Sequence, residues 1–368
     1  MREGTDVFIV GGGPAGLAAA IAARRRGFDV MLADGAEPPI GKACGEGLMP
    51  DALAALRKLG IIVSTTEGFP FRGIRFLEHG VQVESNFPVG HGIGLPRPVL
   101  HQKMIEQARQ MGVTLLWKTP VTALCSEGVT AGGQTIAAPW VVGADGIGSR
   151  VRRWAGLDVH SGNRLRYACR RHYFVEPWSD RIEIYWTRDG QAYVTPVGER
   201  HVCVVLISSR FGMRFASLGN AFPALAERLA LATGVDRERG AVTATVRLDR
   251  VCHEHVALIG DASGSVDAIT GDGLYLSFQQ AEALADALEA GDLRHYQKAH
   301  RRLARRPALM GQLMLLLDGN AALRHRAMSA MAADPTIFER LLAVHVGESS
   351  PSHLAATGAL LGWRLVAA

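Results

Sequence analysis

The chain has 368 residues, of which 48% are hydrophobic and 20% charged, and 40 basic against 35 acidic residues give a net charge of +5. This composition excludes a disordered chain, a collagen and a coiled coil, and the mild, scattered positive charge argues against a nucleic-acid partner. The length predicts two or three structural units.

The cysteines are dispersed along the chain and form neither a CxxC pair nor a zinc spacing, so no metal site is predicted; they stand at positions 44, 125, 169, 203 and 252. Free thiols suit a reducing compartment. The sequence shows no signal-peptide pattern and no uninterrupted run of 18 apolar residues. We therefore expect a cytoplasmic protein without a membrane span.

The first 35 residues predict a strand, a glycine turn, a helix, a second strand and an acidic residue. The first strand is DVFIV at 6–10, the helix runs to Arg26, and the second strand covers 28–33. Gly11, Gly13 and Gly16, around Pro14 and Ala15, fit the pattern G-x-G-x-x-G, in which backbone closely approaches a pyrophosphate at a helix N-terminus. Asp34 stands where a carboxylate can bind ribose hydroxyls. A dinucleotide site follows from this context.

Two later segments narrow the choice of dinucleotide. Residues 140–152 read WVVGADGIGSRVR, which predicts a strand, an Asp-Gly turn and the start of a helix. Residues 256–261 read VALIGD, a buried strand, and are followed by a loop with Gly271 and Gly273 and by an amphipathic helix.

These ordered motifs resemble the FAD-dependent aromatic hydroxylase (p-hydroxybenzoate hydroxylase-like) superfamily, closest to the branch of geranylgeranyl reductases and flavin-dependent halogenases. The resemblance extends to about residue 300. It implies FAD as cofactor and an α/β fold: a Rossmann-like FAD-binding domain, an inserted antiparallel β-sheet substrate domain and a C-terminal helical region. The expected ranges are 1–70, 96–160 and 248–292 for the FAD domain, 71–95 and 161–247 for the sheet, and 293–368 for the helical cap.

The resemblance also implies residue roles. Gly11, Gly13 and Gly16 would surround the FAD pyrophosphate, Asp34 would bind the adenosine ribose, and Asp145 with Gly146 would contact FAD and serve NAD(P)H. Gly260 and Asp261 would contact the ribityl or pyrophosphate region. Gly271, Asp272 and Gly273 would open the helix that faces the flavin pyrimidine, and Arg97 would lie near FAD, in a turn where the family more often has Asp at the position of His101.

The segment KACGEGL, from Lys42 to Leu48, resembles the Cys-Gly-Gly-Gly-Leu stretch of the reductase branch, with Glu46 in place of a glycine. The resemblance implies that Lys42 and Cys44 lie beside the flavin or the substrate entrance. The alternative is a glycine-rich connection with a buried, inert Cys44.

The middle of the chain alternates with a period of two. Residues 182–186, 192–195 and 202–207 predict antiparallel strands, and 72–88 predict two more. In the resembled fold such a sheet roofs the substrate cavity. Tyr193, Thr195, Trp186, Tyr173 and His172 are candidates to line it, with ordinary sheet packing as the alternative for each.

From Leu293 the sequence predicts basic helices. Arginines at 301, 302, 305 and 306 precede Pro307, the run ALMGQLMLLL follows, and the tail HLAATGALLGWRLVAA is again apolar. These residues indicate either membrane-surface contact or a helical cap, and we favour the cap because amphipathic helices bury their apolar stripes. A lipid-like substrate tunnel would use the same residues.

The reaction class follows from the resemblance. The first expectation is an NAD(P)H- and O2-dependent monooxygenase that hydroxylates an aromatic or polyketide-type, lipophilic substrate through a flavin C4a-hydroperoxide. The alternative is an FAD-dependent alkene reductase acting on an isoprenoid or lipid-like molecule. Two further alternatives rank below these. One is a halogenase, whose Trp-x-Trp-x-Ile-Pro stretch is replaced here by residues 193–196, and the other is a non-catalytic flavin-binding module. NAD(P)H is the expected electron donor.

Catalytic residues are not assigned by the sequence. Histidine is the usual base near neutral pH, and His91, His101, His172 and His201 stand near segments expected to border the site. For each of them a surface or packing role is the alternative.

Overall fold

The computed structural model describes residues 4–350. Its first sheet has the strand order β19-β20-β12-β1-β2-β8, and the neighbours from β20 to β8 are parallel. The strands are β1 (Val7–Val10), β2 (Val30–Ala33), β8 (Thr114–Leu116), β12 (Trp140–Gly143), β19 (Cys252–His253) and β20 (Val256–Leu258). Continuous apolar runs such as VFIV form central strands because both of their faces are buried.

Different elements pack on the two faces of this sheet. Val7 and Ile9 pack on helices α1 (Pro14–Arg25), α2 (Pro50–Lys58), α3 (Arg97–Gln110) and α7 (Gly273–Glu289). Phe8 and Val10 face a three-stranded sheet of β9 (Val121–Cys125), β10 (Gly128–Ala131) and β11 (Gln134–Ala137), together with α4 (Arg150–Trp154). The arrangement confirms the Rossmann-like part of the predicted α/β fold.

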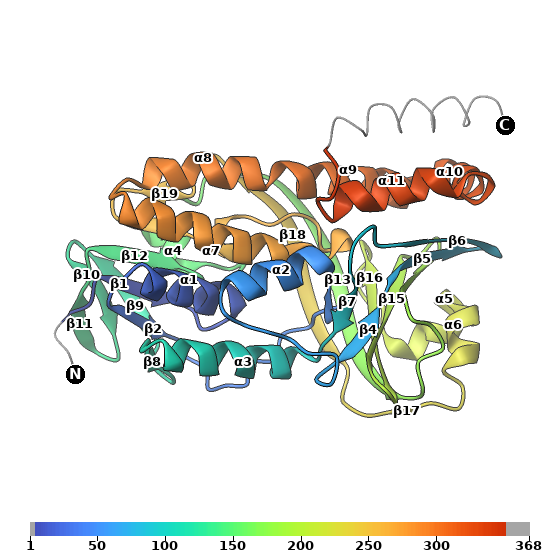
Figure 1. The fold of residues 1–368 in the computed structure, drawn as a ribbon, viewed down its shortest axis with the longest axis horizontal. Coiled ribbons are helices and arrows are strands. Elements are labelled where there is room, and N and C mark those ends of the chain that lie inside the picture. Colours follow the sequence, from blue (N-terminus) through green and yellow to red (C-terminus); the bar gives the residue numbers. More distant parts are fainter. Residues whose placement is uncertain (1–3, 351–368) are drawn as a thin grey trace.

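A second, larger sheet lies beside the first one (Figure 1) and follows the order β17-β13-β16-β15-β14-β5-β6, with β18 also paired to β13. We call it the roof sheet. Its strands are β5 (Gly73–Glu78), β6 (Val81–Asn86), β13 (His160–Phe174), β14 (Ile182–Trp186), β15 (Gln191–Gly198), β16 (His201–Ser208), β17 (Thr233–Gly234) and β18 (Arg239–Leu248). Helices α5 (Leu218–Ala221) and α6 (Pro223–Arg228) pack behind it.

One pairing in the roof sheet differs from the antiparallel arrangement expected from the sequence. Strand β5 runs parallel to β14, with Ile74 opposite Ile182 and Leu77 opposite Tyr185. The two strands come from separate segments of the chain, so no hairpin sets their relative direction. A small three-stranded sheet packs against β15 of the roof sheet and consists of β3 (Gly47–Leu48), β4 (Phe69–Phe71) and β7 (Gly92–Gly94).

The C-terminal helices cover both parts of the molecule. Helix α8 (Leu293–Leu303) runs along α7, and α9 (Arg305–Gly319) follows it and contacts the turn Ala268–Thr270. Helices α10 (Ala321–Ala333) and α11 (Pro335–His345) lie over β6 (Figure 1). Met331 and Phe338 pack there against Phe76 of β5. These helices therefore bury apolar side chains as a cap does. The apolar tail at 353–368 lies outside the described residues, and none of the described helices is long and apolar enough to cross a membrane.

Candidate active site

A continuous cavity of about 770 Å³ joins the two sheets. Its polar end lies at the carboxyl ends of β1, β2, β12 and β20, where α/β proteins bind their ligands. Residues that directly follow these strands line it: Gly11, Asp34, Ala144, Asp145, Gly260 and Asp261. The other end extends beneath the roof sheet and the cap and is apolar, with Ile74, Phe76, Ile184, Met310, Leu313, Met314, Leu317, Met331, Phe338, Leu341 and Leu342 in its wall.

The glycine turn after β1 has the geometry that a dinucleotide site needs. At Gly11 φ is +113°, and an added Cβ would lie 2.4 Å from the carbonyl oxygen of Ala144. At Gly16 it would lie 1.9 Å from the carbonyl oxygen of Gly11. At Gly13, which lines the cavity, it would meet no protein atom within 4 Å. Gly11 and Gly16 are thus required by the protein's own packing, whereas the space beside Gly13 is open to a ligand.

Asp34 and His101 hold this turn in place. The Asp34 carboxylate accepts hydrogen bonds from the backbone N–H groups of Gly12 and Ala36, each at 2.7 Å. Burial lowers the pKa of His101, so the ring is neutral near pH 7; its Nε2 donates to the Gly12 carbonyl at 2.8 Å and its Nδ1 accepts from the backbone of Ile40. His101, which stands where the family more often has Asp, therefore supports the glycine turn and does not line the cavity.

The polar end fits FAD on two observations. Helices α1 and α7 both begin at the cavity, with Gly13 and Gly273 in its wall, and neither helix start has a side-chain cap. Their free N–H groups and positive dipole ends favour the pyrophosphate and the negative charge of a reduced flavin. Arg97 also lines the cavity, and its buried Nε has no hydrogen-bond partner among the described residues.

The remaining predicted cofactor residues are brought to the same cavity with one exception. Lys42 and Asp261 form an ion pair at 2.6 Å in its wall, and Pro14, Ala15, Cys44, Asp145, Gly146, Gly260 and Gly271 also line it. Asp272 does not line the cavity, although both of its neighbours do. Its side chain is 1% exposed, and its carboxylate lies 3.8 Å from His345 Nδ1. Asp272 thus stands at the N-cap of α7, and its side chain is not part of the cavity wall.

The predicted substrate residues divide into two groups. Tyr193 and Thr195 line the cavity, and the Tyr193 hydroxyl donates to the carbonyl of Ile269 at 2.7 Å. Trp186 does not line it: the ring is 2% exposed and lies beyond the cavity, packed edge-on against Phe76. Tyr173 points to the other face of the roof sheet, where it packs on Phe215, because adjacent residues of a strand face opposite ways.

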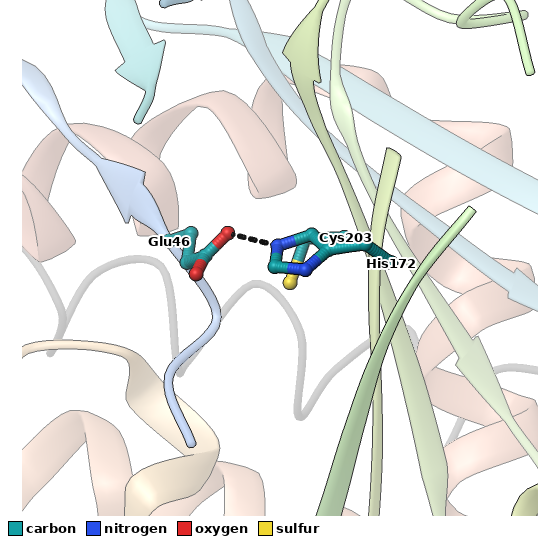
Figure 2. Close-up of side chains that lie close together, drawn as sticks. All are labelled: Glu46, His172 and Cys203. Atoms are coloured by element: carbon teal, nitrogen blue, oxygen red, sulfur yellow. Dashed lines mark hydrogen bonds and ion pairs between the residues drawn. The ribbon is translucent and has the colours of Figure 1, made fainter. Parts of the chain in front are cut away.

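His172, also predicted to line the cavity, instead belongs to a buried cluster at its margin (Figure 2). The ring lies 2.6 Å from the carboxylate of Glu46, whose side chain is 1% exposed. Sequence reasoning identified His172 alone and missed its partner. The signal in the sequence was Glu46 itself, a charged residue where the resembled stretch has glycine. The structure explains the glycine of that stretch, because the φ of +60° at Glu46 is one that glycine adopts easily. Of the other histidines, His91 is exposed and His201 packs on Phe174.

The comparisons with known proteins agree with this geometry. A family model described as an FAD binding domain matches residues 4–292. The chain belongs to this family. Membership confirms the p-hydroxybenzoate hydroxylase-like resemblance and identifies the protein as an FAD-dependent oxidoreductase.

Relatives within the family are similar over most of their length. A menaquinone reductase of Mycobacterium tuberculosis is 26% identical, covering 79% of this chain and 78% of its own. A digeranylgeranylglycerophospholipid reductase of Methanosarcina acetivorans is 27% identical, covering 80% and 78%. Among solved structures, a flavoprotein/dehydrogenase of Cytophaga hutchinsonii has a TM-score of 0.81 at 20% identity, covering 93% of both chains, and supports the fold.

Proposed function

We propose that the protein reduces a carbon–carbon double bond in a long, apolar, isoprenoid-like substrate. The observation that carries the proposal is the continuity of the cavity: its polar end fits FAD, and from there it leads into an apolar space beneath α9, α10 and α11. Aliphatic and methionine side chains dominate that space, and such flexible walls suit an extended hydrocarbon chain.

The relatives support the same substrate class. The matched reductases are named for menaquinone and for a digeranylgeranyl phospholipid, and each match covers about four fifths of this chain. Reduced FAD supplies a hydride in such chemistry, and the protein supplies binding, orientation and exclusion of water. A nicotinamide nucleotide is the proposed source of the electrons, as the family resemblance implies.

Hydroxylation of a lipophilic aromatic ring is the second candidate. It was the first expectation from the sequence, and a dry cavity beside FAD serves it equally well. We rank it below reduction because aliphatic and methionine side chains of α9, α10 and α11 line the cavity in addition to Tyr193 and Thr195, and such a wall suits an extended chain better than a single ring. Halogenation and a non-catalytic flavin module rank lower still.

Anaerobic turnover separates the candidates. FAD-loaded protein is reduced with dithionite under argon and mixed with menaquinone or a geranylgeranyl phospholipid in detergent micelles. Reduction predicts flavin reoxidation and a product that has gained two hydrogen atoms for each double bond reduced. A product that forms only when O2 is admitted and that carries an added oxygen atom would overturn reduction in favour of hydroxylation.

A further inference from the structure

Three ionisable side chains connect the protein surface with the cavity wall. Asp236, between β17 and β18, is 28% exposed, and its Oδ2 lies 3.0 Å from His172 Nδ1. His172 Nε2 lies 2.6 Å from Glu46 Oε2 (Figure 2). Glu46 lies in the wall of the cavity between Gly45 and Gly47. Hydrogen-bonded contacts therefore run without a gap from solvent to the cavity wall.

The sheet register explains why this cluster lies at the cavity. On β13, His172 shares a face with Ala168, which lines the cavity, because residues two apart in a strand point the same way. On the neighbouring β16, Cys203 is opposite His172 and shares a face with Val205, another lining residue. His172 and Cys203 thus lie on the face of the roof sheet that lines the cavity, next to the lining residues.

The charges in the cluster favour a protonated His172. Burial lowers the pKa of His172, but the hydrogen bonds to Glu46 and Asp236 outweigh burial and the nearby Arg170, so the pKa lies above the ordinary histidine value. The imidazolium and Arg170 then balance the two carboxylates. Cys203, which lies beside the ring, is a neutral thiol, since burial raises its pKa well above the usual value.

The same residues are a poor metal site. Glu46, His172 and Cys203 offer ligand atoms within 4.8 Å of one another. However, the Arg170 Nη1 lies 2.6 Å and 3.0 Å from the two ring nitrogens of His172, which places a positive charge where a cation would bind. The direct contact between Glu46 and His172 also occupies the atoms that would be ligands.

We propose that Asp236, His172 and Glu46 form a proton relay that carries protons from solvent to the substrate cavity. Addition of hydrogen across a double bond needs a hydride for one carbon and a proton for the other. The bound flavin would supply the hydride with its electron pair. His172 passes its proton to the Glu46 carboxylate, and the carboxyl group so formed delivers that proton to the second carbon and becomes a carboxylate again. His172 regains a proton from solvent at Asp236. Only the donation to substrate carbon rests on the proposed function.

The test uses FAD-loaded protein, reduced anaerobically and mixed with menaquinone in micelles. Glu46→Gln should lower the rate of product formation by about 100-fold or more, as loss of a general acid does. His172→Gln and Asp236→Asn should cause smaller losses, flatten the pH profile and change the solvent deuterium isotope effect. Glu199→Gln and His253→Gln, two exposed positions, are the matched controls and should leave all of these unchanged. FAD content should be equal in every variant.

A second readout does not depend on turnover. An NMR titration of the histidine rings should show His172 with a pKa above the ordinary value in the unmutated protein and a lower one in Glu46→Gln. If the unmutated protein reduces menaquinone and Glu46→Gln matches its rate and pH profile, the relay is overturned and the proposed reduction stands. If the unmutated protein reduces neither probe lipid, the proposed function fails. The connection from Asp236 to Glu46 is still tested in that case, because the NMR titration needs no turnover. It is overturned if the pKa of His172 is the same in the unmutated protein, in Glu46→Gln and in Asp236→Asn.

Discussion

Arg324 of α10 and Glu78 of β5 form an ion pair in which both side chains are almost completely buried, at 2% and 1% exposed. The same guanidinium donates to the carbonyl of Leu317 at the end of α9 and lies over the ring of Trp186. One side chain thereby links two cap helices to the roof sheet. The apolar end of the cavity lies between the elements that this pair joins.

Removal of one partner should destabilise the fold strongly, because the other is left charged and buried. We expect Glu78→Ala to lower the free energy of unfolding by about 3–5 kcal/mol, measured by urea denaturation. Arg210→Ala, which breaks the exposed pair with Asp189, is the control and should cost less than about 1 kcal/mol. Equal effects of the two substitutions would show that Glu78 does not hold the cap in place.

Two glycines of the same turn should respond differently to alanine. Gly11→Ala should destabilise the apoprotein by at least about 1–3 kcal/mol, because its Cβ meets the backbone at Ala144 and its φ is positive. Gly13→Ala should leave the apoprotein's melting temperature unchanged and weaken FAD binding by about tenfold or more, since the new methyl group enters the ligand space. Thermal melting and FAD titration, each performed on both variants, test this contrast. An unaltered FAD affinity in Gly13→Ala would contradict it.

The apolar end of the cavity should set the length of chain that the enzyme accepts. Leu313 of α9 lines the cavity, whereas Leu316 of the same helix is 55% exposed. Leu313→Trp should lower kcat/KM for a geranylgeranyl substrate by about tenfold or more and affect a geranyl substrate much less, because the indole fills the far end. Leu316→Trp serves as control and should change neither value. A uniform loss for both chain lengths would place the substrate elsewhere.

Asp51 should make stability depend on pH. Burial raises the pKa of this carboxyl group to about 6, although Arg306 donates to it at 2.9 Å. The unfolded chain releases this proton near pH 3.9, so between about pH 4 and 6 only the folded state keeps it. Stability contributed by Asp51 is therefore present below about pH 4 and lost as the pH rises through 6, by about 2–3 kcal/mol.

Urea denaturation of the parent and of Asp51→Asn over this pH range provides the measurement. The free energy of unfolding of the parent should fall relative to that of the variant as the pH rises, and the difference should become constant above about pH 7. Asp249→Asn, at an exposed position, should run parallel to the parent. A difference that grows in the opposite direction would mean that the folded state favours the charged carboxylate.

The FAD end of the fold was predictable because its signals are local. The strands β1, β2, β12 and β20 are continuous apolar runs, and each is followed within two residues by one that lines the cavity. Tyr193 and Thr195, which lie two apart in β15, share the face of the strand that lines the cavity. The strand alternation could not show that Trp186 would be covered by Arg324, because the helix that covers a strand is chosen by tertiary packing.

The rest of the site depends on residues far apart in sequence. Glu46, His172 and Asp236 meet only through the pairing of β13 with β17 and through the backbone of the loop before β3. The parallel pairing of β5 with β14 is equally non-local. Neither spacing nor composition carries such information, since it arises when separate segments dock on one another.

The strand order of the first sheet has a consequence for biosynthesis. Strand β1 is the first to be translated, yet it lies two places from β20, which ends at Leu258, and the cavity also needs the helix start at Gly273. The cavity therefore cannot be completed on the ribosome until Gly273 has emerged, because its wall combines Gly11 with Gly260 and Gly273. Capture of the flavin is therefore expected late in synthesis, after most of the chain has been made.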